Sequence, residues 1–190
     1  SAKVDVDWMP NPDHLVKFGI GDIYHTFTPG VNQFQFSETG TSALDTTFGA
    51  VKHYAHEVSA YIEDDWTVNN SIKGNGGLHY STFFVGDKQY SSFQPRLSFR
   101  YLIDSKSSFK MGYAKMGQFL HLLTNSGIGL PTDLWVPATE KIKPQFSDQI
   151  AAGYARTFND KIEVSLEGYY KTMDNLIEYK DGASFFDSQT

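Results

Sequence analysis

The clearest candidates for acid–base chemistry in this sequence are three consecutive acidic residues, Glu63, Asp64 and Asp65. Paired carboxylates can serve as general acid and general base in hydrolysis. The surrounding segment alternates like a β-strand, however, and successive side chains of a strand leave opposite faces. Only Glu63 and Asp65 therefore share a side. We expect these acids to be solvated charge near the rim of a sheet rather than a catalytic pair.

The other residues that could do chemistry are too few or wrongly spaced for a site. His53 and His56 are three apart, which places them on opposite faces of a strand. Gly74, Gly76 and Gly77 have no helix after them, so we expect close backbone approach or strand bending there rather than a phosphate loop. The chain has no Cys, which excludes thiol nucleophiles and Cys-based zinc sites. We therefore expect no enzyme activity, no catalytic residue, no metal ligand and no cofactor.

The composition of the chain excludes two further classes of protein, nucleic-acid-binding proteins and proteins with transmembrane helices. The 190 residues carry a net charge of −6 with a pI near 5.4, and the 16 Lys and Arg are scattered along the chain. A nucleic-acid-binding protein should show a basic stripe, so we expect no nucleic-acid partner. No apolar run approaches the roughly 18 residues of a transmembrane helix. Transmembrane barrel strands are still allowed, because they alternate and look polar on average.

Alternation of apolar and polar residues predicts the elements of this chain. In FQPRLSFRY (Phe93 to Tyr101) every odd position is a large apolar residue or Pro, and every even one is polar. The same period of two recurs along the chain, whereas no segment has a helical period. We predict eight main strands at residues 3–9, 15–27, 54–69, 71–84, 92–104, 107–117, 147–159 and 161–173.

The connections between these strands alternate in length. Short polar turns rich in Asn, Asp and Ser are expected at residues 10–13, 69–71, 104–107 and 158–161. Longer connections are expected at about 28–53, 85–91 and 118–146. In an up-and-down antiparallel meander, every second connection lies at the same end. We therefore predict that the four short turns lie at one end of the sheet and that 28–53 and 118–146 lie at the other.

One-sided strands fit two classes of protein, and the sequence keeps both open at this point. A soluble β-barrel or sandwich that binds a small apolar ligand would turn its apolar faces inward around a cavity. A transmembrane barrel would turn them toward lipid, with the polar residues inside. Short turns at one rim and long loops at the other are typical of an outer-membrane barrel.

Seven motifs, in this order over about residues 57–180, decide between the two classes by resemblance. They are YIEDDW (Tyr61 to Trp66), GLHY (Gly77 to Tyr80), FQPRLSFRY (Phe93 to Tyr101), SFKMGYAKM (Ser108 to Met116), LPTDLWVP (Leu130 to Pro137), IKPQFSDQIAAGYARTF (Ile142 to Phe158) and VSLEGYYKTMDNLIEY (Val164 to Tyr179). Together they resemble the barrel of a TonB-dependent outer-membrane receptor. The long loop that ends in Lys143-Pro144 is part of this resemblance.

The resemblance implies an all-β fold: an antiparallel up-and-down meander that is part of a 22-stranded transmembrane barrel with a plugged lumen. It also implies active uptake of a large nutrient such as an iron chelate, cobalamin, a glycan or a peptide. The implied partners are that nutrient, the plug domain, the TonB energy-coupling complex and the lipid bilayer, and the implied location is the bacterial outer membrane. The plug and the coupling box are absent from these residues, so we expect residues 1–190 to be a fragment, a partial barrel domain.

The resemblance, together with the alternation of apolar and polar residues, predicts which residues face the lumen, which face lipid and which contact the ligand. We expect Arg96, Arg100, Glu163 and Glu167 to share one face and to point into the lumen, opposite a lipid-facing set of Leu97, Phe99, Val164 and Leu166. In the longest loop we expect ligand contacts from His121, Asn125, Asp133 and Trp135, with packing of the loop against itself as the alternative. We expect Trp66 to be an aromatic ring at the membrane interface. An isolated fragment should hide its apolar face by self-association or by closing into a smaller barrel-like or sandwich unit.

Overall fold

The computed structural model describes residues 1–27, 32–36, 44–48, 53–123, 134–140, 142–159 and 161–177. All regular structure in these residues is β-strand. The eight long strands are β1 (Ala2–Asn11), β2 (His14–Phe27), β5 (His53–Thr67), β6 (Ile72–Val85), β7 (Lys88–Leu102), β8 (Ser107–Gln118), β11 (Gln145–Phe158) and β12 (Ile162–Asp174). The four short strands are β3 (Asn32–Phe36), β4 (Leu44–Phe48), β9 (Leu120–Leu123) and β10 (Leu134–Pro137). Among the described residues, no helix is long and apolar enough to cross a membrane.

The long strands form one 8-stranded antiparallel sheet in the order β1-β2-β5-β6-β7-β8-β11-β12. Apart from the short strands inserted in the long connections, chain order and sheet order are the same. This is the predicted up-and-down meander, and all eight predicted strands are present within a few residues of their expected bounds.

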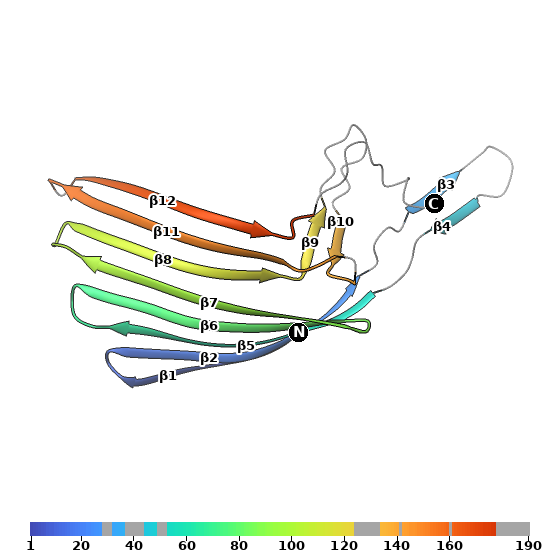
Figure 1. Ribbon diagram of the computed structural model, residues 1–190, viewed down its shortest axis with the longest axis horizontal. Helices are drawn as coiled ribbons and strands as arrows, with labels where there is room; N and C mark the ends of the chain where they lie inside the picture. The colour runs from blue at the N-terminus through green and yellow to red at the C-terminus, as the bar shows by residue number, and fades with distance from the viewer. Residues whose placement is uncertain are drawn as a thin grey trace.

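The two ends of the sheet differ, as Figure 1 shows. Four short connections, at residues 12–13, 68–71, 103–106 and 159–161, lie at one end, which we call the turn end. At the opposite end, the loop end, Phe27 pairs with His53 and Gln118 pairs with Gln145. The long connections 28–52 and 119–144 therefore both leave from the loop end, and the predicted arrangement is confirmed.

The prediction of a longer connection at 85–91 is wrong. Val85 pairs with Lys88, so only Gly86 and Asp87 join β6 to β7. Gly86 has a φ of 53°, a left-handed conformation that glycine adopts without a steric penalty. The polar residues of 88–91 resemble a loop in composition, but they extend the β6–β7 hairpin because each one has a partner in β6.

Asn and Asp side chains hold the turns at the turn end. Asn11 Oδ1 accepts a hydrogen bond from the amide of Asp13 (2.9 Å), and Asp104 Oδ1 accepts one from the amide of Lys106 (2.7 Å). Asn69 Oδ1 accepts two, from the amides of Ser71 (2.8 Å) and Ile72 (2.9 Å). In the fourth turn, Asn159 has a φ of 52°. The turn residues were predictable because these side chains mimic or tolerate turn geometry.

The backbone register fixes which residues share a face of the sheet. Arg100 pairs with Lys110, Lys110 with Gly153, and Gly153 with Glu167, so Arg100 and Glu167 lie on the same face. The period of two adds Arg96 and Glu163 to that face. We call it the polar face. The opposite, apolar face carries the set predicted for it, namely Leu97, Phe99, Val164 and Leu166.

The described part of the chain has little hydrophobic core, and that core does not lie on the apolar face. Apolar-face side chains such as Leu166, which is 76% exposed, face outward, whereas the buried cluster of Ala55, Phe83, Val85, Phe119 and Ala138 lies on the polar face at the loop end. The alternative of a smaller closed unit is wrong, because β1 and β12 are the unpaired edges of an open sheet.

Candidate functional site

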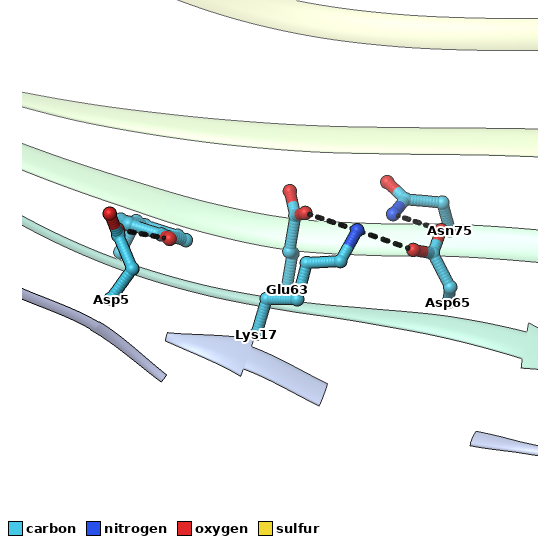
Figure 2. Close-up of polar contacts among 6 residues, drawn as sticks. Asp5, Lys17, Glu63, Asp65 and Asn75 are labelled. Carbon is cyan, nitrogen blue, oxygen red and sulfur yellow. Dashed lines mark hydrogen bonds and ion pairs between the residues drawn. The ribbon is translucent and has the colours of Figure 1, made fainter. Parts of the chain in front are cut away.

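A network of charges lies on the polar face where β2, β5 and β6 meet. Figure 2 shows Lys17 reaching from β2 to both Glu63 (3.6 Å) and Asp65 (3.2 Å) on β5. Asn75 on β6 donates a hydrogen bond to Asp65 (2.7 Å). Asp64 points to the other face, where it contacts Nδ1 of His14 (2.7 Å). As predicted, only Glu63 and Asp65 share a side, and Lys17 contacts both of these carboxylates.

A second polar contact joins β1 to β5 on the same face. The hydroxyl of Tyr61 donates to Oδ1 of Asp5 (2.6 Å), and Asp5 is also paired with Lys3 (3.0 Å). The Tyr61 ring lies over Gly19 of β2, where an added Cβ would come within 2.7 Å of the ring. The ring therefore occupies the space that a larger residue at Gly19 would need, which fixes Tyr61 flat along the polar face.

Two of the three glycines of β6 serve a different purpose from the one expected. Gly74 and Gly76 lie on the apolar face, where the ring of Trp66 covers them; an added Cβ at Gly76 would lie 3.0 Å from the ring. At Gly74 an added Cβ would collide with the ring. These two glycines therefore provide a seat for Trp66 near the turn end, on the face away from the charged residues.

A short hairpin folds back over the polar face at the loop end. Strands β9 and β10 pair with each other, and residue 119, just before β9, anchors them. The rings of Phe119 and Phe83 are stacked with centroids 5.2 Å apart, and the two residues are 2% and 0% exposed. The amide of Ala138 donates to the carbonyl of Phe119 (2.7 Å), and the Tyr90 hydroxyl donates to the carbonyl of Thr139 (2.6 Å). The base of the hairpin is thus fixed to the sheet by packing and by hydrogen bonds.

His121, a predicted ligand contact, lies on the buried side of this hairpin and is 2% exposed. Its Nε2 is 3.1 Å from the carbonyl oxygen of Lys143. Since a carbonyl only accepts, Nε2 donates this hydrogen bond, and Nδ1 is buried without a partner among the described residues. Burial lowers the pKa of His121, and the Lys143 carbonyl partly opposes this. The position supports packing of the loop rather than contact with a ligand.

Trp135 lies on the other side of the hairpin. It pairs with Leu122 across the two strands, and both are exposed, at 52% and 41%. We call this pair the hairpin apolar patch. The other two predicted ligand contacts, Asn125 and Asp133, lie outside the described residues.

The four charged residues predicted for one face do share it, but they form two separate pairs. Arg96 and Arg100 are on β7, whereas Glu163 and Glu167 are on β12, with β8 and β11 between them. Within the described residues, no ion pair joins any of the four. The described residues also form no group of three or more His, Cys, Asp and Glu that could hold a metal ion.

Two polar contacts of the polar face were not predicted, and one of them is buried. His25 Nε2 is 3.3 Å from Glu57, and the Gln94 amide donates to the hydroxyl of Ser81 (3.0 Å). Each of these residues occupies the polar position of an alternating strand, so the sequence places them on this face. Burial of Ser81 and Gln94 depends on packing in three dimensions, which no local pattern predicts.

On the apolar face, the apolar side chains form a band that crosses the sheet, and polar residues lie at both edges of this band. The two edges run obliquely to the rows of residues that are paired between strands. On β5 they are His56 and Asp64, and on β11 they are Asp148 and Arg156. When the backbone pairing is followed from Asp64 across β6, β7 and β8, the residue reached on β11 is Ile150. Ile150 lies six residues before Arg156. Six residues are about 20 Å along a strand and four strand spacings are about 19 Å. The band therefore runs at about 45° to the rows of paired residues.

Comparison with known proteins gives the same fold. The family model described as "TonB dependent receptor-like, beta-barrel" matches residues 1–190. No curated protein matches the chain. A solved structure of the siderophore receptor PirA from Acinetobacter baumannii is similar, with a TM-score of 0.59 and 16% identity, over 89% of this chain and 26% of PirA.

A second similar structure is OmpT, described as an outer membrane protein of Vibrio cholerae. It has a TM-score of 0.54 and 13% identity, over 90% of this chain and 44% of OmpT. The chain thus spans less than half the length of either protein. At these identities the likeness shows the fold, which is that of outer-membrane β-barrels. The match over residues 1–190 shows that this chain belongs to the TonB-dependent receptor-like β-barrel family and that its parent protein lies in the bacterial outer membrane.

Proposed function

We propose that residues 1–190 form one part of the barrel domain of a receptor that takes up a large nutrient by TonB-dependent active transport. The nutrient is an iron chelate, cobalamin, a glycan or a peptide. The plug domain and the energy-coupling complex act through other parts of the receptor, and the protein is not an enzyme. The observation that carries the proposal is the one-sided eight-stranded meander with an exposed apolar face.

The slanted apolar band supports a transmembrane position for this sheet. If the band lies parallel to the membrane, its angle of about 45° to the paired rows is also the tilt of the strands from the membrane normal. Strands of outer-membrane barrels tilt by about 35–45°. Trp66, seated on Gly74 and Gly76, lies just beyond Asp64 at the turn end of β5. Aromatic girdles at the membrane interface are built from residues in this position.

The lengths of the connections give the orientation. Outer-membrane barrels have short periplasmic turns and long extracellular loops, so the turn end faces the periplasm and the loop end faces outward. The apolar face then meets lipid and the polar face lines the lumen, which makes Arg96, Arg100, Glu163 and Glu167 lumen-facing charges. The β9–β10 hairpin folds inward at the extracellular mouth.

The hairpin apolar patch is the part of this mouth best placed to meet a nutrient. Trp135 and Leu122 are exposed side by side on a hairpin whose other side is anchored by Phe119 and His121. A rigid aromatic side chain contributes contact area at low entropic cost. We propose that Trp135 touches the nutrient and that His121 holds the hairpin in place. Asn125 and Asp133 belong to the same connection and remain proposed ligand contacts.

A soluble binder of small apolar ligands is the alternative from another class. That function needs a closed sheet with apolar side chains around a cavity. Here the sheet is open, and large apolar-face residues such as Ile20 and Leu97 are exposed on the side away from the folded hairpin. The observations favour the membrane receptor.

Uptake by cells that carry the full-length receptor tests the proposal. A deletion strain is supplied with labelled ferric chelates, cobalamin, a glycan and a peptide, with iron chelates first because PirA is described as a siderophore receptor. We expect accumulation of one of these nutrients that disappears when TonB is deleted. Trp135→Ala should weaken binding of that nutrient, and Leu102→Ala, at the turn end of the polar face, should not. Uptake that is independent of TonB, or no uptake of any large nutrient, would contradict the proposal.

A further inference from the structure

An exposed group of rings lies on the apolar face at the loop end, on strands β2 and β5. Tyr24 of β2 pairs directly with His56 of β5, and the centroids of their rings are 4.8 Å apart. The ring of Tyr54 is nearly parallel to that of Tyr24, at 11°, with centroids 6.1 Å apart. Both tyrosines are 52% exposed. We call these three residues, together with Asp22, the aromatic patch.

The aromatic patch begins where the apolar band ends. Asp22 and His56 are the first polar residues of the apolar face on the loop side of the band, on β2 and β5 respectively. Nδ1 of His56 is 3.4 Å from Oδ1 of Asp22, and both side chains are about half exposed. A carboxylate accepts hydrogen bonds through both oxygens, and an imidazole can donate or accept. The pair can therefore bind further hydroxyl groups from outside the sheet.

This combination of groups suits a sugar ring. The faces of the two tyrosine rings carry partial negative charge, and the C–H groups on one side of a sugar carry partial positive charge. A sugar can thus lie flat on a tyrosine while its hydroxyls reach Asp22 and His56. The aromatic patch contains no Lys or Arg, so a phosphate group would meet no permanent cation in it. A hydrocarbon chain would contact the rings but leave the carboxylate without a hydrogen-bond donor.

An apolar hollow adjoins the aromatic patch at Asp22, which lines both. The hollow has a volume of about 190 Å³, and its other lining residues on the apolar face are Ala2, Val4, Ile20 and Val58. Lys3 also lines it, and its amine is paired with Asp5 (3.0 Å). Pockets for whole drug-sized ligands have about 300–1,000 Å³. The hollow is smaller, so it suits part of a hydrocarbon chain.

We propose that the aromatic patch and the hollow together bind one glycolipid of the outer leaflet. A sugar of the headgroup lies on Tyr24 and Tyr54, and part of an acyl chain fills the hollow. The inference rests on the proposed function, because it needs the apolar face to meet lipid and the loop end to face outward. Lipopolysaccharide, the glycolipid of that leaflet in bacterial outer membranes, has the matching order of chemistry.

The register places the two parts of the site at the depths that such a ligand needs. Val4 and Ile20, which pair with each other in the hollow, lie two residues closer to the turn end than Asp22. Tyr24 lies two residues from Asp22 in the other direction. The apolar part of the site is therefore on the hydrocarbon side of Asp22, and the rings are on the headgroup side.

Native mass spectrometry of the purified full-length receptor, titrated with lipopolysaccharide that lacks its outer sugars, tests the site. Tyr24→Leu combined with Tyr54→Leu should weaken the tightest lipopolysaccharide binding by about tenfold, because leucine keeps apolar surface but has no ring face. The matched control is Tyr101→Leu combined with Tyr154→Leu, two exposed tyrosines of the same face nearer the turn end. The control should change this binding by less than about twofold.

A second variant tests the hollow without touching the rings. Ala2→Phe should fill the hollow and weaken lipopolysaccharide binding by about tenfold. Ala152→Phe, on the same face of β11, should leave it within about twofold. Equal binding by the Ala2→Phe and Ala152→Phe receptors would overturn the inference.

Two further probes identify the part of the ligand that is recognised. Phosphatidylglycerol, which has acyl chains and no sugar, should bind equally well to the receptor and to the Tyr24→Leu, Tyr54→Leu variant. The oligosaccharide released from lipopolysaccharide, which has no acyl chain, should bind about tenfold more weakly than the intact glycolipid. The inference is overturned if this variant binds lipopolysaccharide like the parent, if phosphatidylglycerol binding falls equally, or if the free oligosaccharide binds as tightly. Uptake is not measured here, so these outcomes are separate from failure of the transport proposal.

Discussion

Truncation of Phe119 shows how firmly the β9–β10 hairpin is held on the sheet. Full burial of a Phe side chain contributes about 1.5–3 kcal/mol, and an aromatic pair adds about 0.5–1.5 kcal/mol. Phe119 is 2% exposed and its ring stacks on Phe83 at 5.2 Å. Phe119→Ala should therefore weaken docking of the hairpin by about 2–4.5 kcal/mol. That corresponds to a factor of about 30 to 1,500 in the docking equilibrium, at about 1.4 kcal/mol per factor of ten.

Hydrogen exchange on the full-length receptor measures this change. The amide of Ala138, which donates to the carbonyl of Phe119 (2.7 Å), and the amides of β9 and β10 should lose protection by that factor until they exchange as a free loop. Leu122→Ala is the matched control, because Leu122 is on the exposed side of the same hairpin. The reasoning is refuted if Phe119→Ala changes exchange by less than twofold, or if Leu122→Ala has the same effect.

Three further predictions concern other parts of the chain. Gly74→Val should lower the free energy of unfolding by about 1–3 kcal/mol, because the Trp66 ring occupies the space of the new side chain; in urea denaturation the cost should vanish in a Trp66→Ala background. Burial lowers the pKa of His121 from 6.5, so hairpin stability that is full above pH 6.5 should be lost as the pH falls through the lowered value. Protease digestion of the hairpin should rise on acidification in the parent receptor and stay flat in a His121→Gln variant. The isolated 190-residue chain should self-associate in light scattering, and a monomer with its apolar face in water would contradict this.

Alternation made the fold predictable to a large extent. A period of two marks each long strand whatever lies beside it, and antiparallel order then follows from short turns. FQPRLSFRY therefore predicted both the strand β7 and the separation of Arg96 and Arg100 from Leu97 and Phe99. The orientation of the acidic residues 63–65 was predictable for the same reason, because neighbouring side chains of any strand lie on opposite faces. The structure adds Lys17 as the cation that contacts Glu63 and Asp65.

The features that sequence analysis missed depend on contacts between distant residues. The four strands β3, β4, β9 and β10 have only 4 or 5 residues each, too few for a period to be recognised. Burial of His121 follows from where the hairpin docks, which no local pattern reports. The role of Gly74 and Gly76 depends on Trp66 across the strand pair, so a glycine that looks like a bend is in fact a seat for a ring.

Accessibility of spin labels along one strand tests the central claim, that the apolar face meets lipid and the polar face lines the lumen. Nitroxide labels are attached to single cysteines at positions 96, 97, 98 and 99 of the full-length receptor in lipid bilayers. The account predicts that the labels at Leu97 and Phe99 collide with lipid-dissolved oxygen and that those at Arg96 and Ser98 do not. Oxygen collisions that favour Arg96 and Ser98, or that show no alternation, would contradict it.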